Sequence, residues 1–451
     1  MTLDNDITAT LARFASGLTY EAIPERVRDR TKDLLLDALA CALAGYRGED
    51  TPKVMRFAAA LGRSQESSIV GGGSLSLAGA TLFNGFLITA VSMCDVYRPT
   101  ATHFQPVIVS PALAVAERDE SSGRDLLVAL VSGFETAARI AAGVDYAAFR
   151  QRGWHGPGTI GPFGAAAAVG RLLEFDTGAM ATAFGLAGSQ AAGTFAAWGT
   201  PSVKFHQFRG ALSGLMAALL AEQEFVATRQ FLTAADGGFY PTYCGGIAKD
   251  AVTAALGEHW ELERIALRPS PTSAASQGIV TALFDLIRRH DLEAGRTKRL
   301  RIHVSPANCD AYRNRRNYSG KWEASASLHY TAAVVLHDRE LWLDQFEPQR
   351  YDDPALKRFS KERVELLGDP RLTAEQAIVE AEMDDGSVLS AYCTASKGTP
   401  ENPLTRAEIE DKFRKGAHNR LTPAAVERIL ETLSHLEELK SVRTLMDTLR
   451  K

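Results

Sequence analysis

The sequence has few cysteines and none of the residue spacings that commonly bind a metal ion. Its five cysteines are scattered over 451 residues without a single CxxC pair, which argues against a disulfide framework and against a structural zinc site. It contains no HExxH pair, no EF-hand loop and no run in which cysteine and histidine cluster along the chain. We therefore expect neither a bound metal ion nor a cofactor.

Long apolar runs and an excess of one charge are also missing. No uninterrupted apolar stretch approaches 18 residues, and no basic-then-apolar leader precedes the first helical pattern. The net charge is −4, and basic residues are neither in excess nor clustered. These absences predict a cytoplasmic protein that binds neither nucleic acid nor membrane.

Three common enzyme motifs are absent as well. The sequence has no phosphate-binding P-loop, no dinucleotide fingerprint and no G-x-S-x-G nucleophile motif. Gly71–Gly73 is not followed by a βαβ pattern, so we interpret it as a turn. An active site in this chain is therefore expected to be built from dispersed residues.

The chain is long enough for two domains, and its first half is patterned for helices. It has 451 residues, of which 45% are hydrophobic and 23% charged, and this length is too great for a single ordinary hydrophobic core. Helices are predicted at 3–18, 24–45, 51–62, 77–90, 106–118, 123–142, 177–192 and 207–223. Frequent alanine and glycine in these segments favour close contact between helices.

The pattern changes after Pro269-Ser270-Pro271. A helix at 274–290, a half-buried strand at 298–304, a helix at 324–338 and a hairpin at 377–394 are predicted there, with further helices at 405–415 and 423–448. Asp385-Gly386 supplies the positive φ that a hairpin turn needs. We predict a mainly α fold: a large helical domain from residues 1–267 and 397–451, with a smaller α+β domain inserted at 268–396.

Gly153–Gly164 is the stretch around which the rest of the chain can be organised. His155 follows an aromatic residue and precedes a dense Gly/Pro turn, and the small-residue run 165–170 is typical of a buried helix. A glycine-rich turn that leads into a helix presents free backbone N–H groups to an anion. The purely structural alternative is a packing turn with a surface histidine.

Other lone polar residues lie in small-residue, apolar surroundings. Asp95 and His103 flank a loop, Tyr146 follows a helix end, and Lys204, His206 and Arg209 stand near the start of one helix. Cations at a helix N-terminus oppose the helix dipole unless an anion lies between them. Taken singly, Asp95 as a helix cap, Tyr146 as a half-buried side chain and His206 as a core histidine are ordinary structural roles. Jointly these residues suit a carboxylate-binding pocket with one or two bases.

Several segments together resemble one known family. They are Leu35–Gly45, Ala80–Gly85, Gly133–Arg139, His155–Gly164, Gly214–Ala221 and Glu323–Ser327. On these segments the chain resembles the MmgE/PrpD family over nearly its whole length, and Trp154–Gly164 is the most specific of them. The resemblance implies a large helical domain made from both chain ends, an inserted α+β domain, and a homodimer without metal. It also implies action on a small polycarboxylate, as in 2-methylcitrate dehydratase, cis-aconitate decarboxylase and iminodisuccinate epimerase.

The family's functional residues are matched only in part. His155 matches the family histidine. The family usually has two aspartates in the run after its Asn-Gly pair; Asp95 matches the second of them, and the first falls on Ser92 here. Lys204 lies two residues before His206, whereas the family lysine lies three before. The later family histidine falls at or near Gln277.

These departures favour a reaction that needs few charged groups. Ser92 and Gln277 cannot act as acid or base near neutral pH, whereas epimerisation needs only one base on each face of a Cα–H and groups that bind the carboxylates. We expect an epimerase of an amino- or imino-dicarboxylate, with Lys204, Tyr146 and His155 as catalytic residues. The predicted substrate-binding residues are Asp95, His103, His206, Arg209, Ser92 and Gln277. The alternatives are a lyase acting on a di- or tricarboxylic acid, and a dimer that binds a polycarboxylate without catalysis.

Overall fold

The computed structural model describes residues 6–450 and is mainly helical, with 59% of the chain in helices and 9% in strands. This confirms the predicted mainly α fold with a smaller α+β part. The chain forms two compact units. The first contains the chain up to Ala90, Cys94–Ala266 and the chain from Thr405 onward, and the second contains Val91–Met93 and Leu267–Leu404.

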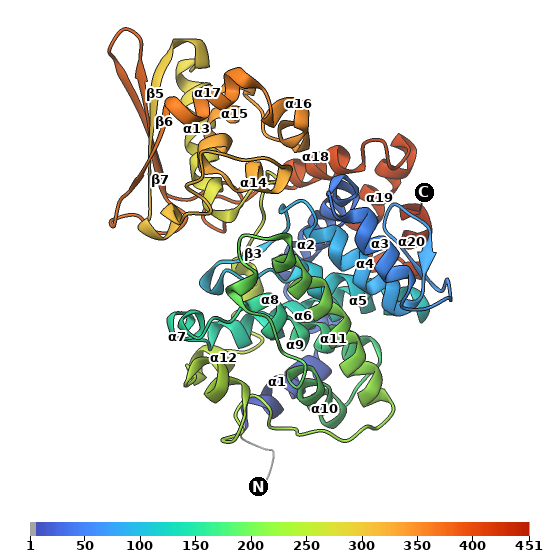
Figure 1. Cartoon of the computed structure of the whole chain (residues 1–451). Helices are drawn as coiled ribbons and strands as arrows, with labels where there is room; N and C mark the ends of the chain where they lie inside the picture. Colours follow the sequence, from blue (N-terminus) through green and yellow to red (C-terminus); the bar gives the residue numbers. More distant parts are fainter. Residues whose placement is uncertain (1–5, 451) are drawn as a thin grey trace. The chain divides into compact units, whose positions relative to one another are not determined.

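Helices build almost all of the first unit (Figure 1). They are α1 (Ile7–Gly17), α2 (Glu25–Ala44), α3 (Thr51–Ala59), α4 (Leu77–Thr89), α5 (Gln105–Arg118), α6 (Gly123–Ala142), α7 (Tyr146–Gln151), α8 (Gly156–Thr159), α9 (Gly161–Leu172), α10 (Thr177–Gly188), α11 (Phe205–Glu222), α12 (Lys249–Thr253), α18 (Arg406–Ala417), α19 (Pro423–Ser434) and α20 (Val442–Leu449). Two short two-stranded sheets accompany them, β1 (Ser67–Ser68) with β2 (Ser74–Leu75) and β3 (Val96–Tyr97) with β4 (Ile265–Ala266).

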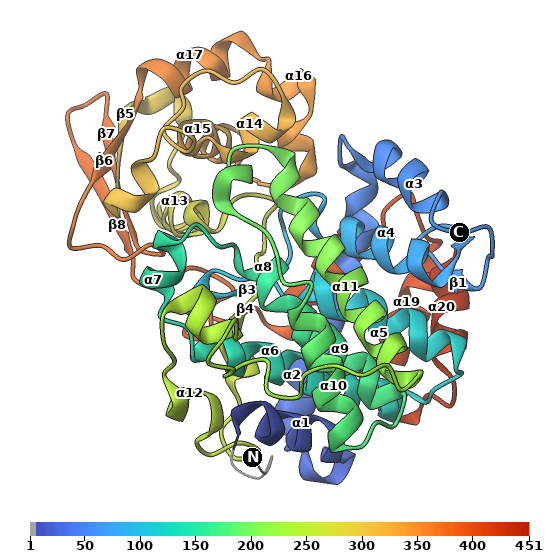
Figure 2. The same ribbon diagram turned by 60° about the horizontal axis from the view of Figure 1, so that its bottom comes forward.

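Helix α9 lies at the centre of the first unit. It packs against α5, α6, α10 and α11, an arrangement that both ribbon views show (Figures 1 and 2). Every residue from Gly161 to Gly170 is buried, as the small-residue run predicted. The packing is close: a Cβ at Gly164 would lie 2.8 Å from the carbonyl oxygen of Gly133 on α6. Small side chains are thus required where α6 and α9 meet.

Both ends of the chain contribute to this unit. Helix α18 packs along α2, and the two are joined by an ion pair between Lys412 Nζ and Asp37 Oδ1 at 2.6 Å, whose side chains are 3% and 0% exposed. Thr405 and Glu408 form a capping box that starts α18.

The second unit has a four-stranded sheet, β5 (Thr297–Val304), β6 (Val364–Gly368), β7 (Ala377–Met383) and β8 (Val388–Cys393), in the order β6-β5-β7-β8. Strands β5 and β6 are parallel and the other pairs antiparallel. The helices of this unit are α13 (Gln277–His290), α14 (Lys321–Ala326), α15 (Leu328–Asp338), α16 (Pro348–Tyr351) and α17 (Pro354–Glu362). Leu300, Ile302 and Val304 of β5 are buried together with residues of α13 and α15, so the predicted alternation of the strand is confirmed.

Some predicted helix bounds were wrong. The segment 324–338 is two helices, because Ser327 is extended and its hydroxyl caps α15 by accepting the N–H of Tyr330. The segment 423–448 is also two helices, α19 and α20. Between them the carbonyl oxygen of Leu439 accepts the N–H of Gly123, which fixes a turn against the start of α6. The helix predicted from residue 3 begins at Ile7, and residues 3–5 lie outside the described part.

Two other helices are shorter than predicted. Helix α3 ends at Ala59 and α10 at Gly188. Across residues 6–450, no helix combines the length and the apolarity needed to cross a membrane.

Candidate functional site

A pair of histidines forms the centre of the candidate site in the first unit. His155 immediately precedes α8, and His206 is the second residue of α11. Their Nδ1 atoms lie 2.8 Å apart, a hydrogen-bond distance. His155 is only 4% exposed, and its ring meets that of Phe195 edge to face at 4.9 Å. Sequence reasoning placed both residues near the site but did not predict that they bond to each other.

Main-chain bonds between two loops bring the pair together. The N–H of His155 donates to the carbonyl of Gly193, and the N–H of Ala192 donates to the carbonyl of Gly158. Gly193 has φ +135°, and a Cβ there would lie 2.9 Å from Cγ of the His206 ring. Glycine is therefore required at this position by its backbone conformation and by the close approach of the imidazole.

The pair can hold one extra proton but not two. Between neutral rings, one Nδ1 carries hydrogen and donates while the other accepts, so one ring presents a lone pair at Nε2 and the other an Nε2–H group. A second added proton would place two N–H donors face to face. Burial lowers the pKa of His155 well below its usual range, and His206, His103 and Arg150 lower it further. Burial also lowers the pKa of His206, followed by the charge of Arg209.

Arg150 and Tyr146 lie on α7, and Arg150 stands beside this pair. The Arg150 guanidinium carbon stands 3.0 Å from the centroid of the Phe195 ring, and Nη1 donates to the carbonyl of Trp154 at 3.4 Å. Burial lowers the pKa of Arg150, which the charge of Tyr146 partly offsets. A cation therefore stands at the edge of the histidine pair, where sequence reasoning had named Tyr146 but not Arg150.

Asp95 and His103 are brought together by the loop between them. His103 Nδ1 lies 2.5 Å from the carbonyl oxygen of Asp95, and the Asp95 carboxylate accepts the N–H groups of Phe104 at 2.8 Å and Gln105 at 3.0 Å. Asp95 thus caps the start of α5, the structural role considered for it above. Burial raises the pKa of the Asp95 carboxyl to about 7, with Cys94 as the next cause.

A buried polar chain holds this loop to the rest of the unit. The side-chain oxygen of Gln105 accepts the N–H of Asp95 at 3.0 Å. Its amide nitrogen donates to the carbonyl of Leu34 at 2.9 Å and to Asp37 at 3.1 Å. Asp37 in turn is paired with Lys412. The position of Asp95 is therefore fixed by residues from α2, α5 and α18.

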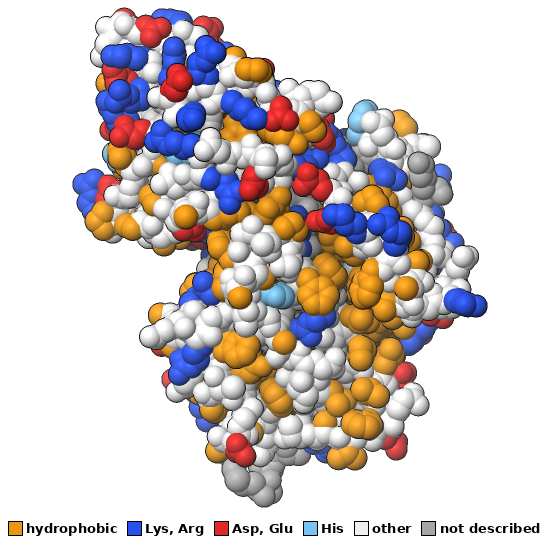
Figure 3. Space-filling model, viewed as in Figure 1, with side chains coloured by type: hydrophobic (Ala, Val, Ile, Leu, Met, Phe, Trp, Pro, Cys, Tyr) orange, Lys and Arg blue, Asp and Glu red, His pale blue; other side chains and the backbone are white. Residues whose placement is uncertain are grey.

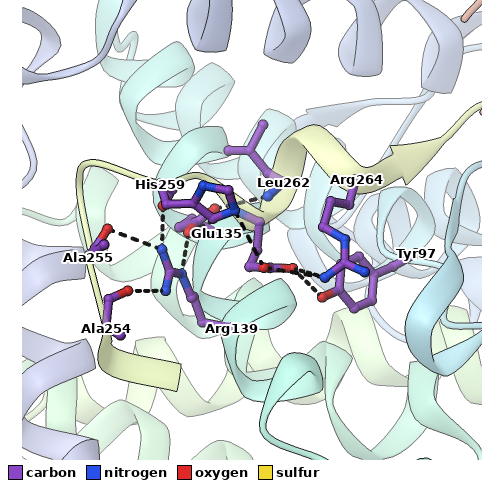
Figure 4. A network of polar contacts seen from close by, with 9 residues as sticks. Tyr97, Glu135, Arg139, Ala254, Ala255, His259, Leu262 and Arg264 are labelled. Carbon is purple, nitrogen blue, oxygen red and sulfur yellow. Dashed lines mark hydrogen bonds and ion pairs between the residues drawn. The ribbon is translucent and has the colours of Figure 1, made fainter. Parts of the chain in front are cut away.

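A second network holds Tyr97, near the start of the same loop (Figure 4). The Tyr97 hydroxyl donates to Glu261 Oε2 at 2.6 Å, and Arg264 pairs with the same carboxylate at 3.1 Å. On α6, Glu135 and Arg139 form an ion pair at 2.6 Å with side chains 0% and 3% exposed. Glu135 accepts the N–H of Glu261 at 3.1 Å, so the two pairs are connected.

Two predicted cationic residues donate hydrogen bonds to main-chain carbonyls. Lys204 Nζ donates to the carbonyl of Ala90. Arg209 donates to the carbonyls of Gln190 at 2.8 Å, Ala192 at 2.9 Å and Gly158 at 3.1 Å. Arg209 thereby ties the 190–193 loop to α8, and its role in substrate binding stays a prediction.

Ser92 and Gln277 belong to the second unit. Ser92 has φ +56°. Gln277 starts α13, and its amide nitrogen donates to the carbonyls of Ser270 at 3.3 Å and Thr272 at 3.5 Å. Its side-chain oxygen is buried and accepts no hydrogen bond from the described residues. The roles of both residues in substrate binding stay predictions.

The second unit also carries a basic surface cavity of about 320 Å³. Arg316, Lys357, Arg358 and Lys361 line it together with Tyr318, whose pKa burial raises to about 12. Lys357 is paired with Asp352 at 2.5 Å, and Arg316 donates to the carbonyl of Lys361 at 2.7 Å. None of the predicted site residues lines this cavity.

Comparison with known proteins identifies the family. Residues 9–250 match the MmgE/PrpD N-terminal domain, and residues 271–438 match the MmgE/PrpD C-terminal domain. The chain belongs to the MmgE/PrpD family. The predicted resemblance is thereby confirmed, and the matched segments span both units.

Cis-aconitate decarboxylases are among the relatives of this MmgE/PrpD chain. A cis-aconitate decarboxylase-like protein, oryM, of Aspergillus oryzae is 28% identical over 99% of this chain and 97% of its own length. The cis-aconitate decarboxylase of Aspergillus terreus is 26% identical, covering 98% and 96%, and the human one 25% identical, covering 98% and 94%. These relatives are lyases, so they support the lyase alternative and do not confirm the expected epimerase.

Proposed function

We propose that the protein is a lyase that removes a carboxyl group from a small polycarboxylate, in the manner of a cis-aconitate decarboxylase. The observation that carries this proposal is similarity over 98–99% of the chain to decarboxylases of fungi and human. The buried pair of His155 and His206 supports it, because such a reaction needs a proton donor in a site with little water.

Decarboxylation leaves an electron pair that must be held and then protonated. The bond between carbon and the departing carboxylate breaks, CO₂ leaves, and the pair of electrons remains on carbon, where an adjacent double bond can spread it. A proton from an acid then forms the new C–H bond. The enzyme must therefore bind the retained carboxylates and supply one proton.

The histidine pair can supply that proton once a bound polycarboxylate is present, because its negative charge favours the protonated form and offsets the lowered pKa values of both rings. The pair accepts one added proton while keeping the 2.8 Å bond between His155 and His206. We assign the proton transfer to His155, oriented by His206. Lys204, Tyr146, His103 and Arg150 supply cationic or hydrogen-bonding groups for the retained carboxylates.

Epimerisation of an amino- or imino-dicarboxylate is the second candidate. Gln277 favours it, because a carboxamide stands at or near the position where the family has a histidine. In that reaction Lys204 and either Tyr146 or His155 would act as the two bases. A dimer that binds a polycarboxylate without turnover is the third alternative.

Proton and carbon NMR in D₂O separates these functions. The substrates are cis-aconitate, citrate, 2-methylcitrate, aspartate and the stereoisomers of iminodisuccinate, each tested with the wild-type chain and with His155→Ala. Decarboxylation gives labelled CO₂ from a carboxyl-labelled substrate, and the product carries one deuterium on carbon. His155→Ala is expected to abolish this signal.

Two other results would contradict the proposal. Exchange of a Cα–H for deuterium with inversion, and without CO₂, would establish the epimerase. Thermal stabilisation by one of these acids without exchange or CO₂ would indicate a binding protein, because a ligand bound only to the native state raises its stability.

We also propose that the protein forms a homodimer through α11. Phe205, Met216 and Leu220 leave one face of this helix apolar and exposed, at 44%, 44% and 38%, and hydrophobic side chains gather over this region in Figure 3. Exposed apolar patches of this kind are typical of protein interfaces. Light scattering should show that Met216→Glu weakens a dimer, while Val388→Glu, at a 53% exposed position of β8, does not. A monomeric wild type would contradict this proposal.

A further inference from the structure

Cys94, Asp95 and His103 form a cluster of three different metal-binding side chains in the first unit. One potential ligand atom from each residue lies within 4.8 Å of the corresponding atoms of the other two. Cys94 and Asp95 are fully buried, while His103 is partly exposed. The cluster is therefore open to solvent on the histidine side only.

The cluster of Cys94, Asp95 and His103 is formed by the fold and could not be predicted from residue spacing. His103 lies eight residues after Asp95, a spacing that belongs to no metal motif. The loop between them closes on itself, because the N–H of Tyr97 donates to the carbonyl of Thr102 at 2.7 Å and the N–H of Thr102 donates back at 3.1 Å. This closure returns His103 to the side of Asp95.

Hydrogen bonds fix the tautomer of His103 and hold the Asp95 carboxylate in place. At 2.5 Å from the carbonyl oxygen of Asp95, Nδ1 of His103 must carry the hydrogen, so the lone pair of the neutral ring is at Nε2. A histidine whose second nitrogen donates to a carbonyl is the usual arrangement of a metal ligand. The Asp95 carboxylate accepts one N–H at each oxygen, from Phe104 and Gln105, and an ionised carboxylate has about four acceptor positions.

We propose that Cys94, Asp95 and His103 bind a borderline-soft divalent cation of the Zn²⁺ class. The donor set is one sulfur, one oxygen and one nitrogen, which suits Zn²⁺ and Co²⁺, whereas Mg²⁺ and Ca²⁺ prefer oxygen ligands alone. Three protein ligands leave one tetrahedral position for water. Binding requires the Cys94 thiol to lose its proton to solvent, since the thiolate is the ligand.

A cation at this position would inhibit the reaction. It would occupy His103, which the proposed function assigns to binding the retained carboxylates of the substrate. This consequence rests on the proposed function, whereas metal binding itself does not. The site is thus an inhibitory one, and the chemistry proposed above runs without the metal.

A Co²⁺ titration of the full-length chain tests the binding site directly. A thiolate bound to Co²⁺ gives a charge-transfer band in the near ultraviolet, and tetrahedral coordination gives strong visible bands. We expect one Co²⁺ per chain, displaced by an equivalent of Zn²⁺ but not by excess Mg²⁺. Cys94→Ser should remove the charge-transfer band and weaken binding at least tenfold.

Cys309→Ser is the matched control. Cys309 is the partly exposed cysteine of the second unit and lies next to Asp310, so it is the alternative site for nonspecific metal binding. Its loss should leave the band unchanged. A band that survives in Cys94→Ser, or one that disappears in Cys309→Ser, would overturn the proposal. Cys94→Ala, checked by circular dichroism and thermal unfolding, separates loss of the ligand from loss of the fold.

Activity assays then separate this proposal from the proposed function. If Zn²⁺ inhibits turnover by the wild type and inhibits Cys94→Ser at least tenfold more weakly, both the site and its inhibitory role are supported. If Co²⁺ binds at Cys94 but turnover is unaffected, the inhibitory role is wrong. If no substrate is turned over, the spectroscopic titration still decides whether the metal site exists.

Discussion

The Nδ1 atoms of His155 and His206 face each other at 2.8 Å, although the two residues are 51 positions apart in the chain. This contact requires the rings to be different tautomers when both are neutral. We expect the pair to act as a single proton-carrying unit, because adding a proton to one ring changes what the other can donate. The histidine of the most specific family segment is thus hydrogen-bonded to a second imidazole at the start of α11.

Substitution of either histidine should reduce turnover strongly. His155→Ala is expected to lower kcat at least about 100-fold, because it removes the proton-transfer group. His206→Asn keeps a hydrogen-bonding group near His155 but cannot carry a proton, so we expect about a tenfold loss in kcat with little change in KM. Steady-state kinetics of the active reaction, over a range of pH, measure both.

The asparagine variant distinguishes a shared proton from simple orientation. If His206→Asn keeps kcat within twofold of the wild type while His206→Phe loses activity, His206 only orients the ring of His155. That result would contradict the idea that the two histidines act as one proton-carrying unit.

Gly193→Ala should damage the site more than the fold. The new Cβ would lie 2.9 Å from Cγ of the His206 ring, at a residue with φ +135°. Gly153→Ala is the matched control, because Gly153 has φ +83° but no neighbour within 4 Å of a Cβ. Both variants should lose about 1–3 kcal/mol of stability from backbone strain. Only Gly193→Ala should also lower kcat/KM at least about tenfold, and equal losses in both variants would contradict the argument.

The sequence predicted the parts of the molecule that depend on local pattern. The buried helix 165–170, the alternating strand 298–304 and the turn at Asp385-Gly386 each follow from spacing within a few residues, and the structure has all three. The helices with a polar start were also placed well, since α6 begins at Gly123 after the capping box of Ser122 and Asp125.

The contacts that build the site could not be predicted in the same way. The pairing of His155 with His206 depends on main-chain bonds to the loop around Gly193, and a main-chain bond leaves no pattern in the side chains. Arg209 was expected to bind substrate because it is a cation near a helix start, and that role stays a prediction, but its contacts within the protein could not be foreseen. Its partners are carbonyl groups of Gln190, Ala192 and Gly158, which only the folded chain brings within reach.

Arg139→Met should destabilise the first unit severely. It would leave the Glu135 carboxylate without its cation. The Glu135 side chain is 0% exposed, and burial raises its pKa. Removing one partner of a buried pair costs about 3–5 kcal/mol. The matched control is Arg124→Met, whose partner Glu21 is 72% exposed, and there we expect less than about 1 kcal/mol. Denaturant unfolding measures both, and similar losses in the two variants would argue against a structural role for the network in Figure 4.

The second unit should lose stability in acid because of His329 on α15. This residue is 1% exposed, its Nδ1 contacts the carbonyl of Val364 at 3.0 Å, and burial lowers its pKa from 6.5 to about 4. Below pH 6.5 this histidine is protonated in the unfolded chain, whereas in the folded chain it stays neutral until the pH falls to about 4. The stabilisation is therefore complete above pH 6.5 and is lost as the pH falls to 4, by about 3 kcal/mol in total.

Thermal unfolding of His329→Gln should show a smaller loss of stability between pH 7 and pH 4 than the wild type. His290→Gln, at the exposed end of α13, should lose as much stability as the wild type. Parallel pH profiles for all three proteins would show that His329 is not responsible for the acid sensitivity.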